Sequence, residues 1–248
     1  MPDTTPSTDA GDCPIVELRR YTLHPGRRDV LIDLFDREFV ETQEAQGLRV
    51  LGQFRDLDRP DLFVWLRGFA DMDTRRRALE VFYGGPVWAA HRDAANATMI
   101  DSDNVLLLRP AWPGAAAALP RHARPAPGDN APAAGVLDAT VFHLREPATP
   151  ALLDYCRHRM APTLLRGGAR HLAWYCTEAS ANTFPRLPVR EGEPVLLGLA
   201  LFGSGAALQS FADSGAWARD VAPGLVPWLA RAPEAHRLQP TARSAWHA

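Results

Sequence analysis

The chain has 248 residues, an apolar fraction of 46% and a formal net charge of -2, values typical of a soluble globular protein with one large or two smaller domains. No basic stripe interleaved with aromatic residues occurs, which argues against nucleic-acid binding. All 27 basic residues are arginines, so lysine chemistry such as Schiff bases, pyridoxal-phosphate attachment and Walker A loops is excluded. No apolar run approaches the roughly 20 residues that a membrane span needs.

The first residues, 1–14, contain acidic side chains and no apolar core, so we expect a disordered tail rather than a secretory or transit signal. Cys13, Cys156 and Cys176 are odd in number, widely spaced and outside any CxxC pair. We therefore expect thiols in a reducing compartment, with the cytoplasm as the default location.

Residues 15–110 predict a first half built from four strands and two helical regions. The expected elements, in chain order, are a strand at 15–23, a one-sided apolar helix ending at Gly47, strands at 49–57 and 62–69, a helical region capped at Asp71 or Asp73 and interrupted at 84–86, and a strand at 104–110.

The segment 111–135 is rich in Pro, Ala and Gly and has neither a helical nor a strand period, so it is expected to be a linker. Residues 136–242 then repeat the element order of the first half. A constant offset of 121 residues pairs Tyr21 with Phe142, Leu31 with Leu152, Gly47 with Gly168 and Leu51 with Leu172, and Trp88 and Trp217 match after an insertion near 181–192.

Each half is thus predicted to be β-α-β-β-α-β, the ferredoxin-like arrangement, with helices on one face of an antiparallel sheet. The other sheet face needs a cover, and the sister half can provide it. The predicted fold class is therefore α+β, with two tandem ferredoxin-like halves that form a dimeric α+β barrel within one chain.

The alternation within the strands predicts which side chains share a face. We expect Val16 and Leu18 to face the helices, and the other strand face to line the barrel interior. The predicted interior residues are Glu17, Arg19, Tyr21, Gln53, Phe63, Trp65 and Arg67 from the first half, and Asp138, Thr140, Phe142, Trp174 and Ala200 from the second. The first half contributes mainly polar side chains and the second half mostly apolar ones, which would suit a ligand with a polar head and an apolar body. The alternative is a solvated strand face or a structural ion pair between Glu17 and Arg19.

Several motifs of the first half resemble the NIPSNAP family of dimeric α+β barrel proteins. They are the E-x-R-x-Y strand, the PG turn, the aromatic strand LFVWLRGF, the Arg-rich helix start, the P-x-W element and the N-x-L-L-x-P end. The resemblance covers about 15–110 and implies a fold more than an activity, because the wider group includes cofactor-free monooxygenases, cyclases, isomerases and haem-dependent enzymes. In the second half Asp138-x-Thr140-x-Phe142 replaces the E-x-R-x-Y pattern.

The residue types suggest proton-transfer chemistry next to a carbonyl. Arg19 and Arg67 could hold an oxyanion, Tyr21 could orient it, and Glu17 or Asp138 could serve as a general base or acid if desolvation raised its pKa. We predict Glu17, Arg19, Tyr21 and Arg67 as catalytic residues. The predicted ligand-binding residues are Gln53, Phe63, Trp65, Asp138, Thr140, Phe142 and Trp174.

The resulting expectation is a cofactor-independent, metal-free tailoring enzyme that acts on a partly apolar metabolite bearing a carbonyl or acid group. One alternative is a non-catalytic ligand-binding or scaffold protein whose barrel interior is filled. Another is a haem protein using one of His24, His91, His143, His158 or His171 as the proximal ligand. We expect a small-molecule ligand, no nucleic acid and no membrane partner, and a homodimer through the outer helices remains open.

Overall fold

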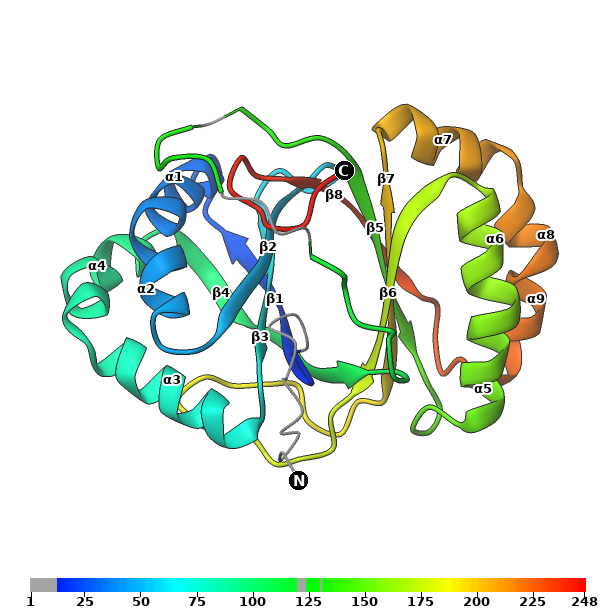
Figure 1. The fold of residues 1–248 in the computed structure, drawn as a ribbon, viewed down its shortest axis with the longest axis horizontal. Coiled ribbons are helices and arrows are strands. Elements are labelled where there is room, and N and C mark those ends of the chain that lie inside the picture. Colours follow the sequence, from blue (N-terminus) through cyan, green and yellow to red (C-terminus); the bar gives the residue numbers. More distant parts are fainter. Residues whose placement is uncertain (1–12, 120–123, 130) are drawn as a thin grey trace, which may run out of the picture.

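The computed structural model describes residues 13–119, 124–129 and 131–248. Eight strands form a closed antiparallel barrel in the order β1-β3-β2-β8-β5-β7-β6-β4. Figure 1 shows α1 to α4 outside one side of this barrel and α5 to α9 outside the other, while the strands lie between the two helical layers. The predicted α+β barrel of two tandem ferredoxin-like halves is confirmed.

The first half runs from β1 to β4, and its predicted element order is the observed one. Its elements are β1 (Ile15–Leu23), α1 (Arg28–Leu34), the π-helix η1 (Phe35–Phe39), α2 (Val40–Glu44), β2 (Arg49–Asp56), β3 (Leu62–Phe69), α3 (Met72–Gly84), α4 (Pro86–Asn96) and β4 (Met99–Pro110).

The second half begins after the linker and repeats this plan. Its elements are β5 (Val136–His143), α5 (Pro150–Tyr155), the π-helix η2 (Cys156–Met160), α6 (Ala161–Arg166), β6 (Ala169–Thr177), β7 (Val195–Phe202), α7 (Gly205–Asp213), α8 (Ala216–Asp220), α9 (Ala222–Leu225), the 3-10 helix η3 (Val226–Trp228) and β8 (Glu234–Pro240). The two halves join where β2 pairs with β8 and β4 pairs with β6.

The repeat extends to local backbone geometry. The π-helical segments η1 and η2 begin 121 residues apart, at Phe35 and Cys156. Gly47 and Gly168 follow these helices with φ of 86° and 98°, in the left-handed region that favours glycine. The later helices start alike as well, since the side chain of Asp71 caps α3 and that of Ser204 caps α7.

The barrel interior is filled by apolar side chains from all eight strands. A single buried cluster contains Val16, Leu18, Val64, Leu66, Leu106, Leu137, Tyr175, Leu199 and Leu238, among others. Ala117 of the linker and Trp246 near the C-terminus belong to the same cluster, and Figure 1 shows the C-terminus of the chain between the two helical layers. The described part of the barrel interior is thus occupied by packed apolar side chains.

The predicted assignment of the strand faces is therefore wrong. Glu17, Arg19, Tyr21 and their counterparts lie on the outer face, between the sheet and the helices, while Val16 and Leu18 point into the barrel. Alternation correctly sorted the side chains into two sets but did not identify which set faced inward. An eight-stranded barrel is narrow enough for side chains to fill, and apolar residues do so, including the rings of Phe54, Tyr175 and Trp246. The polar and aromatic residues that were predicted to line the interior lie under the helices instead.

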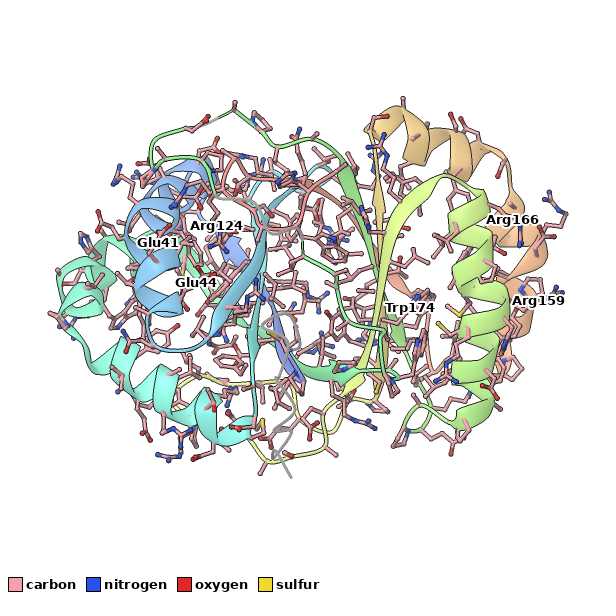
Figure 2. The ribbon with its side chains drawn as sticks, viewed as in Figure 1. Glu41, Glu44, Arg124, Arg159, Arg166 and Trp174 are labelled. Atoms are coloured by element: carbon pink, nitrogen blue, oxygen red, sulfur yellow. The ribbon has the colours of Figure 1, made fainter. Side chains whose placement is uncertain are left out.

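The linker is fixed to the first half by ion pairs. Arg124 donates to both carboxylate oxygens of Glu44 at the end of α2, at 2.7 and 2.8 Å. The three labelled side chains Glu41, Glu44 and Arg124 lie close together in Figure 2.

The N-terminal tail was expected to be disordered, but its residue Cys13 is buried against the barrel. Residues 1–12 of that tail lie outside the described part of the chain. None of the helices formed by the described residues is long and apolar enough to cross a membrane.

Candidate functional site

The acidic residue of β1, Glu17, lies at the centre of a buried ion cluster in the first half. Its Oε2 accepts hydrogen bonds from Arg19 Nη1 and from Arg67 Nε, each at 2.8 Å, and its Oε1 accepts one from Arg75 Nε at 2.6 Å. All four side chains are at most 1% exposed. The structure thus brings together the predicted residues Glu17, Arg19 and Arg67, and it adds Arg75 from α3.

The electrostatics of Glu17 differ from the prediction. Burial alone would raise the pKa of this carboxyl, but Arg67, Arg19 and Arg75 outweigh burial and hold the pKa well below its usual range. The prediction of a raised pKa at Glu17 is therefore wrong. A carboxylate that stays ionised throughout the physiological range and is bound by three guanidinium groups is unsuited to proton transfer.

Neutral acceptors complete the ion cluster. They are Tyr21 Oη for Arg19 Nε (2.9 Å), Gln43 Oε1 for Arg67 Nη1 (3.1 Å), and Asn182 Oδ1 and Thr183 Oγ1 for Arg75 Nη1 (3.0 and 3.1 Å). Asn182 and Thr183 come from the β6–β7 loop, residues 178–194, so a segment of the second half closes the cluster of the first.

The remaining predicted residues of the first half are packed under the helices. Phe63 and Trp65 are at most 1% exposed, and both make edge-on contacts with the ring of Tyr21 at centroid distances of 6.3 and 6.0 Å. Gln53 is bound separately, because its Nε2 donates to Asp36 Oδ1 on η1 at 3.1 Å. These positions therefore build a core rather than an open site.

The second half has a cavity of about 460 Å³ between its sheet and its helices. This volume lies within the range of small-molecule sites. The four second-half residues predicted to bind a ligand, namely Asp138, Thr140, Phe142 and Trp174, all line it. Leu208, Phe211 and Trp217 from α7 and α8 close the opposite wall.

Strand pairing explains why the space beside Glu17 is filled and the space beside Asp138 is hollow. In the first half Glu17 pairs with Arg67, and Arg19 pairs with Trp65. In the second half the equivalent positions pair Asp138 with Ala200, and Thr140 with Gly198. Two of the largest side chains of the first half are thus replaced by a methyl group and a hydrogen atom.

The space left at Gly198 is partly taken by Trp174. A Cβ atom placed on Gly198 would lie 2.6 Å from Trp174 Cζ3, so the indole ring packs directly on the glycine backbone. Figure 2 places Trp174 between β6 and α6, on the helix-covered side of the sheet. Trp174 Nε1 is buried and has no hydrogen-bond partner among the described residues, which leaves a donor in the wall of the cavity.

Asp138 is the acidic group of this cavity. Its Oδ1 accepts one long hydrogen bond from Thr140 Oγ1, at 3.4 Å, and no ion pair to it occurs within the described residues. Nearby His236 and Arg237 are engaged by Asp56 and Asp58. Desolvation raises the pKa of Asp138 to about 6, and the Thr140 hydrogen bond and His236 oppose this effect only weakly. Asp138 is thus a desolvated carboxyl in a mostly apolar pocket.

The groove along the β6–β7 loop and the histidines considered as haem ligands are weaker candidates for a functional site. A wider groove of about 710 Å³ runs along the β6–β7 loop, but Arg190 and Glu193 in its lining pair with each other. None of the histidines considered as haem ligands lines either this groove or the second-half cavity, and the described residues contain no cluster of three or more metal-ligating side chains.

The sequence patterns did not indicate that Arg75, Gln43 and the β6–β7 loop complete the first-half cluster, or that Gly198 and Leu208 line the second-half cavity. One signal was available. An offset of 133 residues relates Trp65 to Gly198, Arg67 to Ala200 and Arg75 to Leu208, and each step replaces a large side chain by a smaller one. This loss of side-chain volume along the offset, rather than any change in polarity, is the signal that indicates the cavity.

Comparison with known proteins agrees with this architecture. Residues 16–112 match the NIPSNAP family model, which confirms the resemblance of the first half, whereas no curated protein matches the sequence. Among solved structures, a proposed monooxygenase from Lactobacillus acidophilus is 9% identical and superposes with a TM-score of 0.55, covering 92% of this chain and 93% of that one.

Two further structures cover nearly the whole chain. A proposed monooxygenase from Fusobacterium nucleatum has a TM-score of 0.57 at 9% identity, over 92% of this chain and 93% of that one. An anthrone oxidase-like protein has a TM-score of 0.52 at 15% identity, over 96% and 98%. At these identities the likeness concerns the fold alone. Residues 16–112 are thus similar to the NIPSNAP family, and they are joined in one chain to a second ferredoxin-like half in a barrel fold that these solved structures share.

Proposed function

We propose that this protein is a cofactor-independent enzyme that transforms a small, partly apolar molecule bearing a carbonyl group, and that the reaction takes place in the second-half cavity. The observation that supports this proposal is the position of Asp138, a carboxyl group with no ionic partner among the described residues, in a cavity walled by Phe142, Trp174 and Trp217. A desolvated carboxylate in an apolar site is a strong proton acceptor.

The cavity residues have distinct roles in this proposal. The aromatic walls bind the apolar body of the substrate, and Asp138 removes a proton from a carbon or hydroxyl group next to the carbonyl. The unpartnered indole N–H of Trp174 is a donor for the oxygen on which negative charge develops. The first-half cluster of Glu17, Arg19 and Arg67 stabilises the barrel and takes no part in this proton transfer.

Oxygenation is the version of this chemistry that the structural neighbours favour, because two of them are proposed monooxygenases and one is anthrone oxidase-like. An anthrone loses a ring proton to the base and becomes an electron-rich enolate. Reaction with one O2 then gives the anthraquinone and one water molecule, so no further reductant is needed. Isomerisation or cyclisation would use the same first step without O2.

The test uses anthrone as the probe substrate, with quinone formation followed by absorbance. We expect Asp138→Asn to lower kcat/KM by at least about 100-fold, as for loss of a general base, and the wild-type rate to rise with pH through about 6. Asp154→Asn, on the exposed outer side of α5, is the matched control and should keep the wild-type rate.

Full activity of Asp138→Asn would contradict the assignment. If the wild-type protein binds anthraquinone in calorimetry but turns over neither anthrone nor related carbonyl compounds, the non-catalytic ligand-binding alternative is favoured instead. Ala200→Phe, which inserts a ring into the cavity, should abolish binding in both cases.

A further inference from the structure

A second, smaller cavity of about 330 Å³ lies in the first half, between β1, α3, α4 and the β6–β7 loop. Arg19 and Tyr21 of β1 line it and are 1% and 6% exposed, so they form its buried floor. This cavity is separate from the second-half cavity and shares no lining residue with it.

The floor of this cavity belongs to a cluster with excess positive charge. Three buried guanidinium groups, those of Arg19, Arg67 and Arg75, face the single carboxylate of Glu17, which leaves a formal excess of two positive charges. The other acceptors of the cluster are neutral, and Arg75 Nη2 has no hydrogen-bond partner among the described residues. Because arginine stays protonated and buried charge is costly without a counter-charge, a second anion would stabilise this cluster.

The rim of the cavity carries positive charge as well. Arg92 of α4 and Arg186 of the β6–β7 loop both line it and are exposed, and no aspartate or glutamate is among its lining residues. Among the described residues, Arg92 forms an ion pair only with its exposed neighbour Asp93, at 3.4 Å. Both the floor and the rim therefore favour a negatively charged occupant.

The walls of the cavity are aromatic. Tyr83 meets Trp88 edge-on at 4.9 Å between ring centroids and stacks on Phe184 at 5.9 Å, and all three residues line the cavity. Arg186 lies over the ring of Phe184 at 5.8 Å. Flat walls of this kind bind a planar apolar body.

We propose that this first-half cavity is a binding site for a small aromatic carboxylate. The carboxylate faces Arg19 and Tyr21, where a guanidinium group matches its planar geometry, and the ring lies against Tyr83, Trp88 and Phe184. The site is independent of the reaction proposed for the second half.

The experiment is isothermal titration calorimetry of the full-length protein with 2-naphthoate, compared with the neutral 2-naphthol and with inorganic phosphate. We expect 2-naphthoate to bind at least about 10-fold more tightly than either, because only it combines the charge with the ring. Equal binding of 2-naphthol would overturn the charge argument, and equal binding of phosphate would overturn the aromatic assignment.

Variants locate the site. Arg92→Gln and Arg186→Gln change exposed residues and should each weaken 2-naphthoate binding by about 2- to 5-fold, the effect of a solvent-screened charge. Arg19→Gln should weaken it by at least about 10-fold, provided that circular dichroism shows the variant folded. Arg76→Gln, an equal loss of charge on the exposed face of α3, is the matched control.

Two outcomes would overturn the location. One is an equal effect of Arg76→Gln and the two rim variants, which would indicate a general effect of net charge. The other is loss of 2-naphthoate binding in Ala200→Phe, which blocks the second-half cavity and should leave the first-half site intact.

Discussion

Glu17 and Asp138 occupy equivalent positions on the first strands of the two halves, yet their surroundings are opposite. Three guanidinium groups bind Glu17 and hold its pKa well below the usual range, whereas Asp138 has one long hydrogen bond and a pKa raised to about 6. The same backbone plan thus holds a carboxylate bound by three guanidinium groups in one half and a desolvated carboxyl group in the other.

The difference arises on the neighbouring strand rather than at the carboxylates themselves. Trp65 and Arg67 fill the space beside Glu17, while Gly198 and Ala200 leave space beside Asp138. In a duplicated fold, one half can therefore keep large, paired side chains under its helices while the other half has small ones at the equivalent positions and forms a cavity there. Four variants test this comparison.

The largest effect on the free energy of unfolding is expected from Glu17→Gln. It removes the only carboxylate from a cluster of three buried arginines, so the free energy of unfolding should fall by about 3–5 kcal/mol. Urea denaturation at pH 7.5 measures the change, and Glu80→Gln on the exposed face of α3 is the control. A loss below about 1 kcal/mol would show that the cluster does not depend on this carboxylate.

Asp138→Asn is expected to change the free energy of unfolding in the opposite direction, by raising it. The folded-state pKa of about 6 lies above the ordinary value of 3.8, so ionisation of Asp138 destabilises the fold between these two pH values and above them. Asn carries no such cost and should stabilise the protein by up to about 3 kcal/mol at pH 7.5, and by little at pH 4.

The measurement for this variant is the difference in unfolding free energy from the wild type between pH 4 and pH 8. The difference is needed because the pKa of Asp36 is also raised to about 6, by burial, and both proteins share that effect. A pH-independent difference would contradict the desolvated state of Asp138.

An intermediate effect is expected from Gly198→Ala. Its Cβ would meet the ring of Trp174 at 2.6 Å, so the ring must move into the cavity at a cost of about 1–3 kcal/mol. Gly205→Ala, whose Cβ would make an ordinary 3.8 Å contact, is the control. Unchanged stability and unchanged ligand binding in Gly198→Ala would show that Trp174 does not shape the cavity.

The smallest effect is expected from Trp174→Phe. The lost packing is partly offset by removal of a buried, unpaired N–H, so stability should change by less than about 1 kcal/mol. Affinity for a carbonyl ligand such as anthraquinone should fall by up to about 10-fold, while affinity for anthracene, which lacks the oxygen, stays the same. Equal losses for both ligands would mean that the indole N–H is not a donor to the ligand.

The sequence predicted the architecture well because apolar periodicity and the 121-residue offset follow directly from the duplicated elements. Gly47 and Gly168, for example, mark the same helix end in both halves through their positive φ. The grouping of Glu17 with Arg19 and Arg67 also followed from strand alternation and pairing.

Three aspects of the site were not predicted. Alternation fixes which side chains share a face, but barrel closure and packing decide which face is inside, so the predicted lumen was reversed. The pKa of Glu17 is lowered by Arg67 and Arg19, which strand alternation had already grouped with it, and also by Arg75, which is 58 residues away along the chain and reaches the cluster from α3. The cavity of the second half depends on the small side-chain volume at Gly198 and Ala200. A pattern of polar and apolar residues contains no information about side-chain volume.

The most direct test of the central claim is a crystal structure of the wild-type protein soaked with anthraquinone. We expect electron density for the ligand in the second-half cavity, between Asp138 and the aromatic walls of Phe142 and Trp217, with the barrel interior unchanged. Density for the ligand inside the barrel, or under the helices of the first half alone, would contradict it.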